Sequence, residues 1–567
     1  MEQAYSRWLT HVTEPELLEQ LKNMSEQERQ EAFCRELAFG TGGLRGILGA
    51  GTNRMNVYTV RRATQGLANY LKKQKLPLSA AIAHDSRRCG RAFAEAAACV
   101  LAANGVKVYL YPRLEPTPAL SWAVRYFSCG AGICITASHN PKEYNGYKVY
   151  WSDGAQLPPH KAEAIAKQME AIDIFTGFKT CDFDEAVAEG KIEIIGHETD
   201  ELFLENVMTQ AIDKDVVKEV ADDLRIVYTP FHGCGYKLVP EALRRLGIKH
   251  LYPVEQQMVI DGRFPTVESP NPENPEGFYL AVDLAKRVNS DLIIGTDPDS
   301  DRIGTMVRGA DGEYSVITGN QLGCLLLDYV INARRATGTM PENPGAMASI
   351  VSTSMARTIC EKNGVHFEDT FTGFKFMAEL VNHWDAAGTY HYIFAFEESY
   401  GYMMGNYVRD KDAVTASMMV AEMAAHYHKL GMTLLDALKA LYEKYGYYKE
   451  KTLNLVMPGV DGVEKMKNLM AQLRSNPPEE ISGVEVVRMR DYSDGSIYVA
   501  GLGKVGTTPF SGSNVLYFEL ADGCTFIIRP SGTEPKIKIY LLVKGSDMAQ
   551  CEERIEKYFD YANALVK

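Results

Sequence analysis

Apolar and polar positions repeat one pattern three times in the first 445 residues. Each copy has an apolar strand, a polar loop, a helix-like stretch that ends near a glycine, and a second strand. The copies begin at Ala80, Leu224 and Met347. A left-handed cap is expected at the end of each helix, at Gly105, Gly247 and Gly364. Strand, helix and strand in this order favour crossover connections, so the pattern predicts three similar α/β domains with mixed sheets.

The pattern changes after about residue 445, where shorter strand candidates follow one another. They read SIYVAGL, NVLYFEL, CTFIIRP and KIKIYLLV, and an amphipathic stretch covers 548–567. This order predicts a smaller C-terminal α+β domain, and the stretch before Phe39 is expected to be helical. The predicted domains are 1–200, 201–312, 313–445 and 446–567.

Composition narrows the class of protein. The chain has 567 residues, of which 46% are hydrophobic, enough for several cores. It contains no run of about 18 apolar residues and no signal-peptide core, so we expect no membrane span and a cytoplasmic location. Eleven cysteines without a CxxC pair indicate reduced thiols. A net charge of −13 disfavours nucleic-acid binding, and an anionic ligand would need local positive charge.

One polar turn, TASHNP, places Ser138 directly after an apolar run. Such residues often do no more than satisfy backbone groups in a turn. A serine hydroxyl held there can also carry a covalent group. Other parts of the chain supply the chemistry that would favour the second interpretation.

The sequence DPDSDR follows the apolar strand Leu292–Ile294 and brings three carboxylates into one turn. Asp297, Asp299 and Asp301 can converge on one hard cation, and Mg²⁺ is the expected ion. A calcium EF-hand loop would require Gly at its sixth position and Glu at its twelfth, where this chain has Arg302 and Arg308. A solvated acidic turn is the simpler alternative.

Two further loops carry groups suited to a sugar phosphate. RPSGTEP offers the Arg529 fork and turn amides to an anion, although such residues also make ordinary hairpins. FEESYG puts Glu397 and Ser399 at a strand exit, where they can bond to sugar hydroxyls or be solvated. GLGKVG at 501–506 matches a dinucleotide motif but is not followed by a helix, so we discard it.

Together the motifs resemble the α-D-phosphohexomutase family. FGTGGLRG, TASHNP, DPDSDR, FEESYG and RPSGTEP occur in the family's order across almost the whole chain. The resemblance implies three α/β domains and a smaller C-terminal domain around a central cleft. FEESYG departs from the GEMSGH form of bacterial phosphomannomutase-type enzymes, which favours the phosphoglucomutase and phosphopentomutase branch.

The resemblance also implies roles for individual residues. Ser138 would be the phosphoserine, with a phosphoryl oxygen completing the Mg²⁺ shell of the three aspartates. Lys148 would be the general base if neighbouring cations lower its pKa toward neutral, Lys411 the second proton-transfer lysine, and His139 a support for the loop. The expected charge-neutralising and substrate-binding residues are Arg45, Arg302, Glu397, Ser399, Thr372, Gly373, Arg529, Ser531, Gly532 and Thr533.

The implied reaction interconverts glucose 1-phosphate and glucose 6-phosphate through a phosphoserine and glucose 1,6-bisphosphate, with one Mg²⁺ per chain. Pentose or mannose phosphates are alternative substrates, and a glucose 1,6-bisphosphate synthase is an alternative activity. A non-catalytic sugar-phosphate sensor is the remaining alternative. We expect a monomer or weak homo-oligomer whose partner is the small-molecule substrate.

Overall fold

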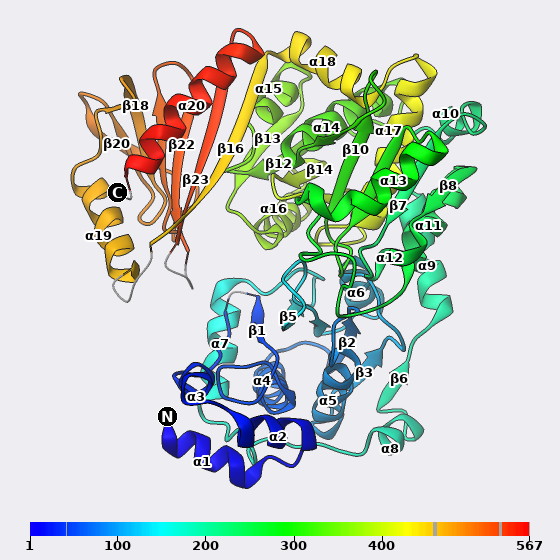
Figure 1. The fold of residues 1–567 in the computed structure, drawn as a ribbon, viewed down its shortest axis with the longest axis vertical. Coiled ribbons are helices and arrows are strands. Elements are labelled where there is room, and N and C mark those ends of the chain that lie inside the picture. Colours follow the sequence, from blue (N-terminus) through cyan, green and yellow to red (C-terminus); the bar gives the residue numbers. More distant parts are fainter. Residues whose placement is uncertain (41, 458–461, 532–535, 566–567) are drawn as a thin grey trace. The chain divides into compact units, whose positions relative to one another are not determined.

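The computed structural model describes residues 1–40, 42–457, 462–531 and 536–565. It divides into two compact units. Figure 1 labels the helices and strands of both. Unit 1 contains Met1–Met347 and Gly373–Leu435, and unit 2 contains Ala348–Thr372 and Asp436–Lys567. Three mixed α/β sheets and a C-terminal β-rich part confirm the predicted fold class.

The first sheet of unit 1 has the strand order β1-β5-β4-β2-β3-β6. Strand β2 pairs in parallel with β3 and β4, whereas β5 pairs antiparallel with β4 and β1. The strands are β1 (Gly43–Ile47), β2 (Ser79–His84), β3 (Lys107–Leu110), β4 (Ala131–Ile135), β5 (Tyr144–Trp151) and β6 (Ile192–Ile194). The accompanying helices are α4 (Val57–Leu71), α5 (Gly90–Ala103), α6 (Thr117–Tyr126), α7 (Pro159–Glu170) and α8 (Phe183–Ala188).

Three short helices precede this sheet, as the sequence predicts. They are α1 (Glu2–His11), α2 (Pro15–Asn23) and α3 (Glu26–Phe33). The buried Trp8 ring lies edge-on to Phe33 and Tyr58, with ring centroids 5.8 and 5.6 Å apart. Aromatic burial of this kind fixes the helices to α4.

Strand β1 begins with a glycine, Gly43, for a steric reason. Its φ is +122°, and a Cβ added there would lie 1.8 Å from the carbonyl oxygen of Tyr147 on β5. Only glycine permits both the conformation and the close approach. The strand therefore carries Arg45 along the sheet edge next to β5.

The second sheet has the order β11-β10-β9-β7-β8, with β7 parallel to both β8 and β9. Its strands are β7 (Arg225–Thr229), β8 (His250–Pro253), β9 (Leu292–Thr296), β10 (Ile303–Arg308) and β11 (Tyr314–Ile317). The helical segments are α9 (His197–Met208), α10 (Lys214–Glu219), α11 (Gly235–Leu246), α12 (Glu255–Met258), the 3₁₀ turn η1 (Pro275–Phe278) and α13 (Tyr279–Val288). The DPDSDR loop connects β9 to β10.

A third group of strands in unit 1 runs in the order β12-β14-β15. These strands are β12 (Pro344–Ser349), which continues into unit 2, β14 (His391–Glu397) and β15 (Gly401–Met403). Three helices belong with them: α14 (Gly319–Ala336), α16 (Phe374–Ala387) and α17 (Ala413–Lys429). FEESYG connects β14 to β15.

Unit 2 is built on a long sheet with the order β16-β23-β22-β21-β18-β19-β20, and β17 pairs with β18. Its strands are β16 (Tyr447–Val456), β17 (Glu480–Ile481), β18 (Val484–Asp491), β19 (Ser496–Val499), β20 (Gly503–Thr507), β21 (Leu516–Leu520), β22 (Thr525–Pro530) and β23 (Lys536–Gly545). The remaining elements are α15 (Met355–Lys362), β13 (His366–Thr370), α18 (Leu434–Tyr445), which begins in unit 1, α19 (Gly462–Ser475) and α20 (Met548–Ala564).

The segment 348–372 packs into the C-terminal part of unit 2. The ring of Phe371 lies edge-on to those of Phe510 and Tyr492, with centroids 4.6 and 5.6 Å away. Such pairs bury apolar surface in preferred geometries. Two stretches that are distant in sequence therefore share one core.

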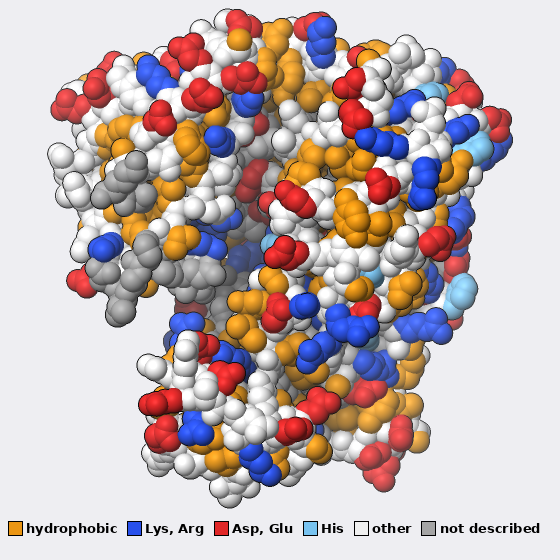
Figure 2. Space-filling view, viewed as in Figure 1, with side chains coloured by type: hydrophobic (Ala, Val, Ile, Leu, Met, Phe, Trp, Pro, Cys, Tyr) orange, Lys and Arg blue, Asp and Glu red, His pale blue; other side chains and the backbone are white. Residues whose placement is uncertain are grey.

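Several local predictions are confirmed. Gly105, Gly247 and Gly364 have positive φ at the ends of α5, α11 and α15. Residues 503–507 form strand β20, so the dinucleotide-like motif lacks its helix, as expected. On the visible face, acidic and basic side chains are interspersed (Figure 2).

Candidate active site

Ser138 lies in the turn that follows β4, and its side chain faces the DPDSDR loop. Its Oγ donates a hydrogen bond of 2.9 Å to Asp297 Oδ2 and lies 3.3 Å from His139 Nδ1. Ser138 is 4% exposed and has φ +51°, a left-handed conformation that is uncommon for a residue with a Cβ. The predicted phosphoserine is therefore held in a defined orientation next to a carboxylate.

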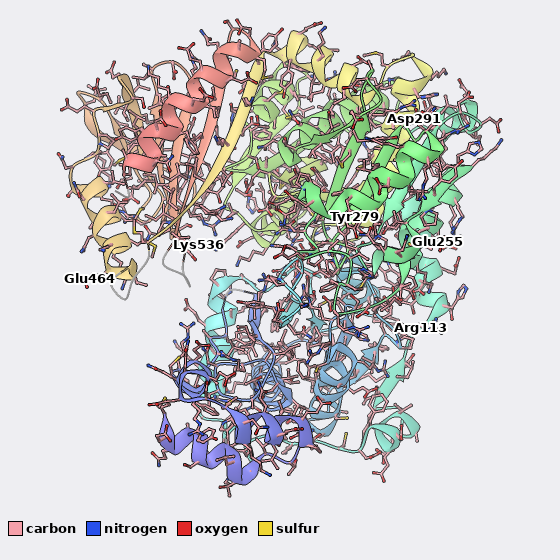
Figure 3. All side chains as sticks on the ribbon, in the orientation of Figure 1. Arg113, Glu255, Tyr279, Asp291, Glu464 and Lys536 are labelled. Atoms are coloured by element: carbon pink, nitrogen blue, oxygen red, sulfur yellow. The ribbon has the colours of Figure 1, made fainter. Side chains whose placement is uncertain are left out.

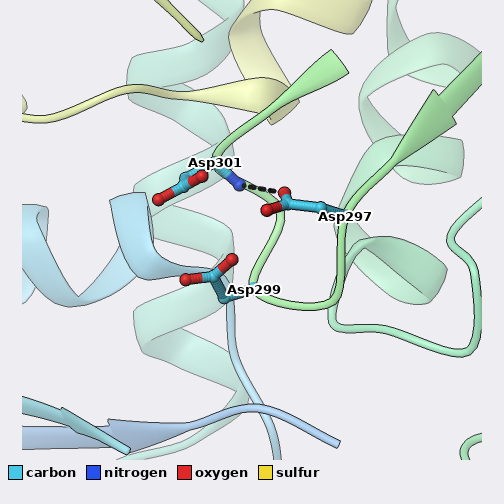
Figure 4. Close-up of side chains that lie close together, drawn as sticks. All are labelled: Asp297, Asp299 and Asp301. Carbon is cyan, nitrogen blue, oxygen red and sulfur yellow. Dashed lines mark hydrogen bonds between the residues drawn. The ribbon is translucent and has the colours of Figure 1, made fainter. Parts of the chain in front are cut away.

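The three aspartates of the DPDSDR loop surround a common point (Figure 4). One ligand oxygen from each lies within 4.8 Å of the others, and all three residues are buried. Asp297 Oδ1 accepts hydrogen bonds from the backbone amides of Asp301 (3.0 Å) and Arg302 (2.9 Å), which closes the turn. Thr117, at the start of α6, donates to Asp299 Oδ2 at 3.1 Å.

The unused oxygens of this cluster fit a hard cation. Asp299 Oδ1 and Asp301 Oδ1 are buried and have no hydrogen-bond partner among the described residues. Burial and the neighbouring carboxylates raise the pKa of Asp297, so a cation and a proton would compete for this group. Oxygen-only donors at a strand exit match the preference of Mg²⁺.

Two lysines approach the aspartates from different parts of the chain. Lys148 Nζ, on β5, lies 2.7 Å from Asp299 Oδ2 and 3.2 Å from Asp301 Oδ2. Lys411 Nζ lies 3.4 Å from Asp301 Oδ2 and 3.1 Å from Asp410 Oδ1. Both lysines are less than a tenth exposed. The predicted proton-transfer groups are thus next to the predicted metal ligands.

The electrostatic surroundings of Lys148 differ from the expectation. Burial disfavours its ammonium form, but the attraction of Asp299 and Asp301 outweighs burial and raises its pKa above the ordinary value. We expected neighbouring cations to lower this pKa. The sequence did not reveal that the nearest charges would be the carboxylates of another domain.

His139 and Arg45 lie beside the serine loop. Burial, followed by the positive charges of Arg302 and Arg45, lowers the pKa of His139 well below its usual range, so its imidazole is neutral. Arg45 is exposed on β1 and donates to Asn140 Oδ1 at 3.0 Å. A neutral ring thus lies beside Ser138, and a cation from β1 binds the same loop. Loop support by His139 and charge neutralisation by Arg45 stay predictions.

Arg302, in the DPDSDR loop, is hydrogen-bonded to the FEESYG loop. Its Nη1 donates to the Ser399 carbonyl at 3.0 Å and to Glu273 Oε1 at 2.6 Å. The buried Glu397 carboxylate accepts from the amide of Gly373, which has φ +109° and begins α16. The structure therefore brings the predicted sugar-binding residues of unit 1 together.

The remaining predicted residues belong to unit 2. Thr372 follows β13, and Arg529 lies near the end of β22; both are half-buried. Ser531 N–H donates to the carbonyl of Lys536, the first residue of β23, at 2.8 Å. Lys536 is labelled in Figure 3. Gly532 and Thr533 lie outside the described residues. The roles of Thr372, Arg529, Ser531, Gly532 and Thr533 stay predictions.

Several residues that the sequence analysis did not single out contact the site, among them Asp85, Arg87 and Glu273. Asp85 and Arg87 follow β2, and Glu273 lies in the irregular segment before η1. The sequence did contain a signal for Asp85 and Arg87, which are polar residues just after an apolar strand. Because that strand, β2, is parallel to β4, residues that follow it lie at the same edge of the sheet as Ser138. We found no comparable signal for Glu273.

Comparison with protein families gives three matches along the chain. The descriptions are "Phosphoglucomutase/phosphomannomutase, alpha/beta/alpha domain I", II and III, and they match residues 36–174, 201–311 and 318–445. A phosphoglucomutase of Staphylococcus aureus strain MRSA252 is 34% identical over 557 residues, which is 97% of either chain.

Solved structures show the same fold. A putative phosphomannomutase from Thermus thermophilus has a TM-score of 0.68 at 19% identity, covering 93% of this chain and 99% of that one. Parafusin, a phosphoglucomutase from Paramecium in an open form, has a TM-score of 0.67 at 19% identity, covering 92% and 94%. In the part of the chain that the structure describes, no helix is long and apolar enough to cross a membrane.

Proposed function

Because the chain belongs to the phosphoglucomutase/phosphomannomutase family, we propose that it interconverts glucose 1-phosphate and glucose 6-phosphate through a phosphoserine at Ser138. One observation carries the proposal: the buried Ser138 hydroxyl donates to Asp297 within a cluster of three carboxylates and two lysines. Glucose is the proposed sugar because the relatives that are 34% identical along almost the whole chain are named phosphoglucomutases.

In the proposed cycle, the phosphoryl group moves between Ser138 and the two ends of the sugar. The free hydroxyl of a sugar monophosphate attacks the phosphorus of phospho-Ser138, the bond to Oγ breaks, and glucose 1,6-bisphosphate forms. The bisphosphate turns around and returns its other phosphoryl group to Ser138. The isomeric monophosphate then leaves, and the phosphoenzyme is regenerated.

The chain's own groups suit the proton transfers and the charge. Lys148 and Lys411 exchange protons with the sugar oxygens. In one direction of the reaction a lysine ammonium protonates the leaving oxygen, and in the reverse direction the same lysine, as a neutral amine, accepts the proton of the attacking hydroxyl. Neutral His139 supports the Ser138 side chain, while Arg45 and Arg302 offset negative charge. Mg²⁺ held by Asp297, Asp299, Asp301 and a phosphoserine oxygen would withdraw charge from the transferring phosphoryl group.

We propose substrate-binding roles for two groups of residues. Glu397, Ser399, Thr372 and Gly373 are proposed to contact sugar hydroxyls, and a reversible orientation requires contacts that accept either end. Arg529, Ser531, Gly532 and Thr533 are proposed to hold the phosphate that does not react, because a guanidinium fork and turn amides suit a dianion.

The protein is proposed to act in the cytoplasm as a monomer or weak homo-oligomer, without a nucleic-acid or membrane partner. Eleven free thiols and a net charge of −13 support this proposal. Light scattering of the purified protein across a concentration series tests the oligomeric state, and a stable tetramer would contradict it.

The direct test compares kcat/KM for glucose, mannose and ribose 1-phosphates in the presence of Mg²⁺ and glucose 1,6-bisphosphate. We expect glucose 1-phosphate to be preferred and Ser138→Ala to abolish turnover, while Ser6→Ala, an exposed serine on α1, changes nothing. A preference for ribose or mannose would reject glucose as the substrate. Net release of bisphosphate from an acyl phosphate donor without isomer formation would indicate a synthase.

A further inference from the structure

Arg87 is a cation enclosed in the protein beside the serine loop. The side chains of Arg87 and Asp85 have no exposed surface, and Arg87 Nε lies 3.1 Å from Asp85 Oδ2. Both residues follow β2, whose last residue, His84, pairs with Ile135 at the end of the parallel strand β4. A buried charge is costly unless it is fully paired, so the contacts of Arg87 indicate its role.

The guanidinium of Arg87 binds the backbone of Ser138 and of the residues that follow it. Its Nη2 donates to the carbonyls of Ser138 and Asn140, and its Nη1 donates to those of Pro141 (2.9 Å) and Tyr144 (3.0 Å). Five donors in a rigid fork allow one side chain to serve this many acceptors. The turn is therefore fixed by one residue from the neighbouring strand.

Asp85 connects Arg87 to the amide of Ser138. Its carboxylate accepts from Arg87 N–H at 2.9 Å and from Thr136 Oγ1 at 2.7 Å. Thr136 Oγ1 in turn accepts from Ser138 N–H at 2.8 Å. Hydrogen bonds thus connect both the amide and the carbonyl of Ser138 to the Asp85–Arg87 pair.

The conformation that this network holds is one that serine rarely adopts. Ser138 has φ +51°, and such a conformation persists when its surroundings over-determine it. The orientation directs Oγ to Asp297 at 2.9 Å. The ring of Phe264, from the second α/β domain, lies over the guanidinium of Arg87, with 5.1 Å between Cζ and the ring centroid.

We propose that Arg87, fixed by Asp85, is a positioning residue that keeps Ser138 in its left-handed conformation, so that Oγ faces the aspartate cluster. The inference rests on the proposed function, because it assigns Arg87 a part in phosphoryl transfer at that site. Arg87 bonds to backbone carbonyls and reaches the reacting oxygen only through the serine backbone. Loosening it should slow transfer to and from Ser138 and leave sugar-phosphate binding intact.

Arg87→Lys tests the proposal, because lysine keeps the charge but loses the fork. The matched control is Arg88→Lys, at the neighbouring exposed arginine. We expect kcat to fall about 100-fold with KM changed less than about threefold, as for a misplaced reacting group. The single-turnover rate at which glucose 1,6-bisphosphate phosphorylates Ser138, followed by intact-protein mass spectrometry, should fall by the same factor.

Thr136→Val provides a second, milder variant that removes only the hydroxyl between Asp85 and the Ser138 amide. We expect kcat and the phosphorylation rate to fall about tenfold, again without a matching change in KM. If Arg87→Lys does not fold, this variant decides the question alone.

The outcomes of these experiments distinguish this inference from the proposed function. Suppose that wild type and Arg88→Lys are both active, and that folded Arg87→Lys or Thr136→Val has the same kcat and phosphorylation rate. The positioning role is then overturned, and the proposed function stands. A loss that appears in KM or melting temperature while the phosphorylation rate is unchanged overturns the positioning role as well. If wild type itself shows no mutase turnover, the proposed function fails.

Discussion

Lys148 Nζ lies 2.7 Å from Asp299 Oδ2, although 151 residues separate the two along the chain. Lys148 comes from β5 of the first α/β domain, and Asp299 comes from the loop between β9 and β10 of the second. The ion pair brings a proton-carrying group of one domain to a predicted metal ligand of the other. The site is therefore assembled from both domains, and each side of it can be tested alone.

Removing the Lys148 ammonium should affect turnover more than binding. We expect Lys148→Met to lower kcat about 100-fold or more, as for loss of a general acid or base, with a smaller effect on KM. Steady-state kinetics in both directions of the reaction provide the measurement. Lys142→Met, at an exposed lysine in the same region, should behave like wild type; equal losses in the two variants would argue against a specific role.

Replacing one carboxylate should weaken the cation site. Asp301→Asn removes a charge from a residue whose Oδ1 has no hydrogen-bond partner among the described residues, so we expect the apparent Mg²⁺ affinity to fall about 10- to 100-fold. The apparent Mg²⁺ affinity is measured from the dependence of turnover and of melting temperature on Mg²⁺ concentration. Asp311→Asn, at an exposed turn, is the control. Wild-type Mg²⁺ dependence in Asp301→Asn would contradict the site.

Glu273 should matter through Arg302. Glu273→Gln keeps an acceptor for Arg302 Nη1 but removes the negative charge, 2.6 Å away in the structure. We expect kcat/KM to fall about tenfold, equivalent to about 1.4 kcal/mol, because Arg302 also binds the FEESYG loop. Glu276→Gln, exposed in the same segment, is the matched variant. The interpretation fails if both variants retain full activity.

Glu450 should make the stability of unit 2 depend on pH. Burial raises the pKa of this carboxyl to about 7, although a hydrogen bond from Thr353 acts to lower it. Above about pH 4.5 the unfolded chain has released this proton, whereas the folded protein keeps it until about pH 7. The free energy of unfolding therefore falls as pH rises from about 4.5 to 7, by at most about 1.4 kcal/mol per pH unit.

Melting temperatures between pH 5 and 8 test this prediction. Relative to Glu450→Gln, which cannot titrate, wild type should lose melting temperature as pH rises. Glu443→Gln, at an exposed glutamate on α18, should retain the wild-type pH dependence. Parallel curves for wild type and Glu450→Gln would exclude Glu450 as the source.

What the sequence revealed depended on where the interacting groups lie along the chain. Asp297, Asp299 and Asp301 occupy one turn after one apolar strand, so local spacing was enough to predict their convergence. Gly105, Gly247 and Gly364 are likewise local signals of helix ends, and their positive φ confirms them.

Other features were hidden because they depend on contacts over long distances. Arg87 binds backbone carbonyls, which every residue has, so nothing in the acceptor sequence marks them. The carboxylates beside Lys148 come from another domain, which is why its pKa was expected to shift the other way. The bounds of the four predicted domains stay predictions.

The division of the chain also limits how the protein can be dissected. The polypeptide passes between the two units three times, after residues 347, 372 and 435. A gene fragment that begins at residue 446 would therefore lack Phe371, whose ring packs against Phe510 and Tyr492. A single protease cut cannot release unit 2 intact, and recombination that exchanged it between relatives would need to transfer two separate stretches of coding sequence together.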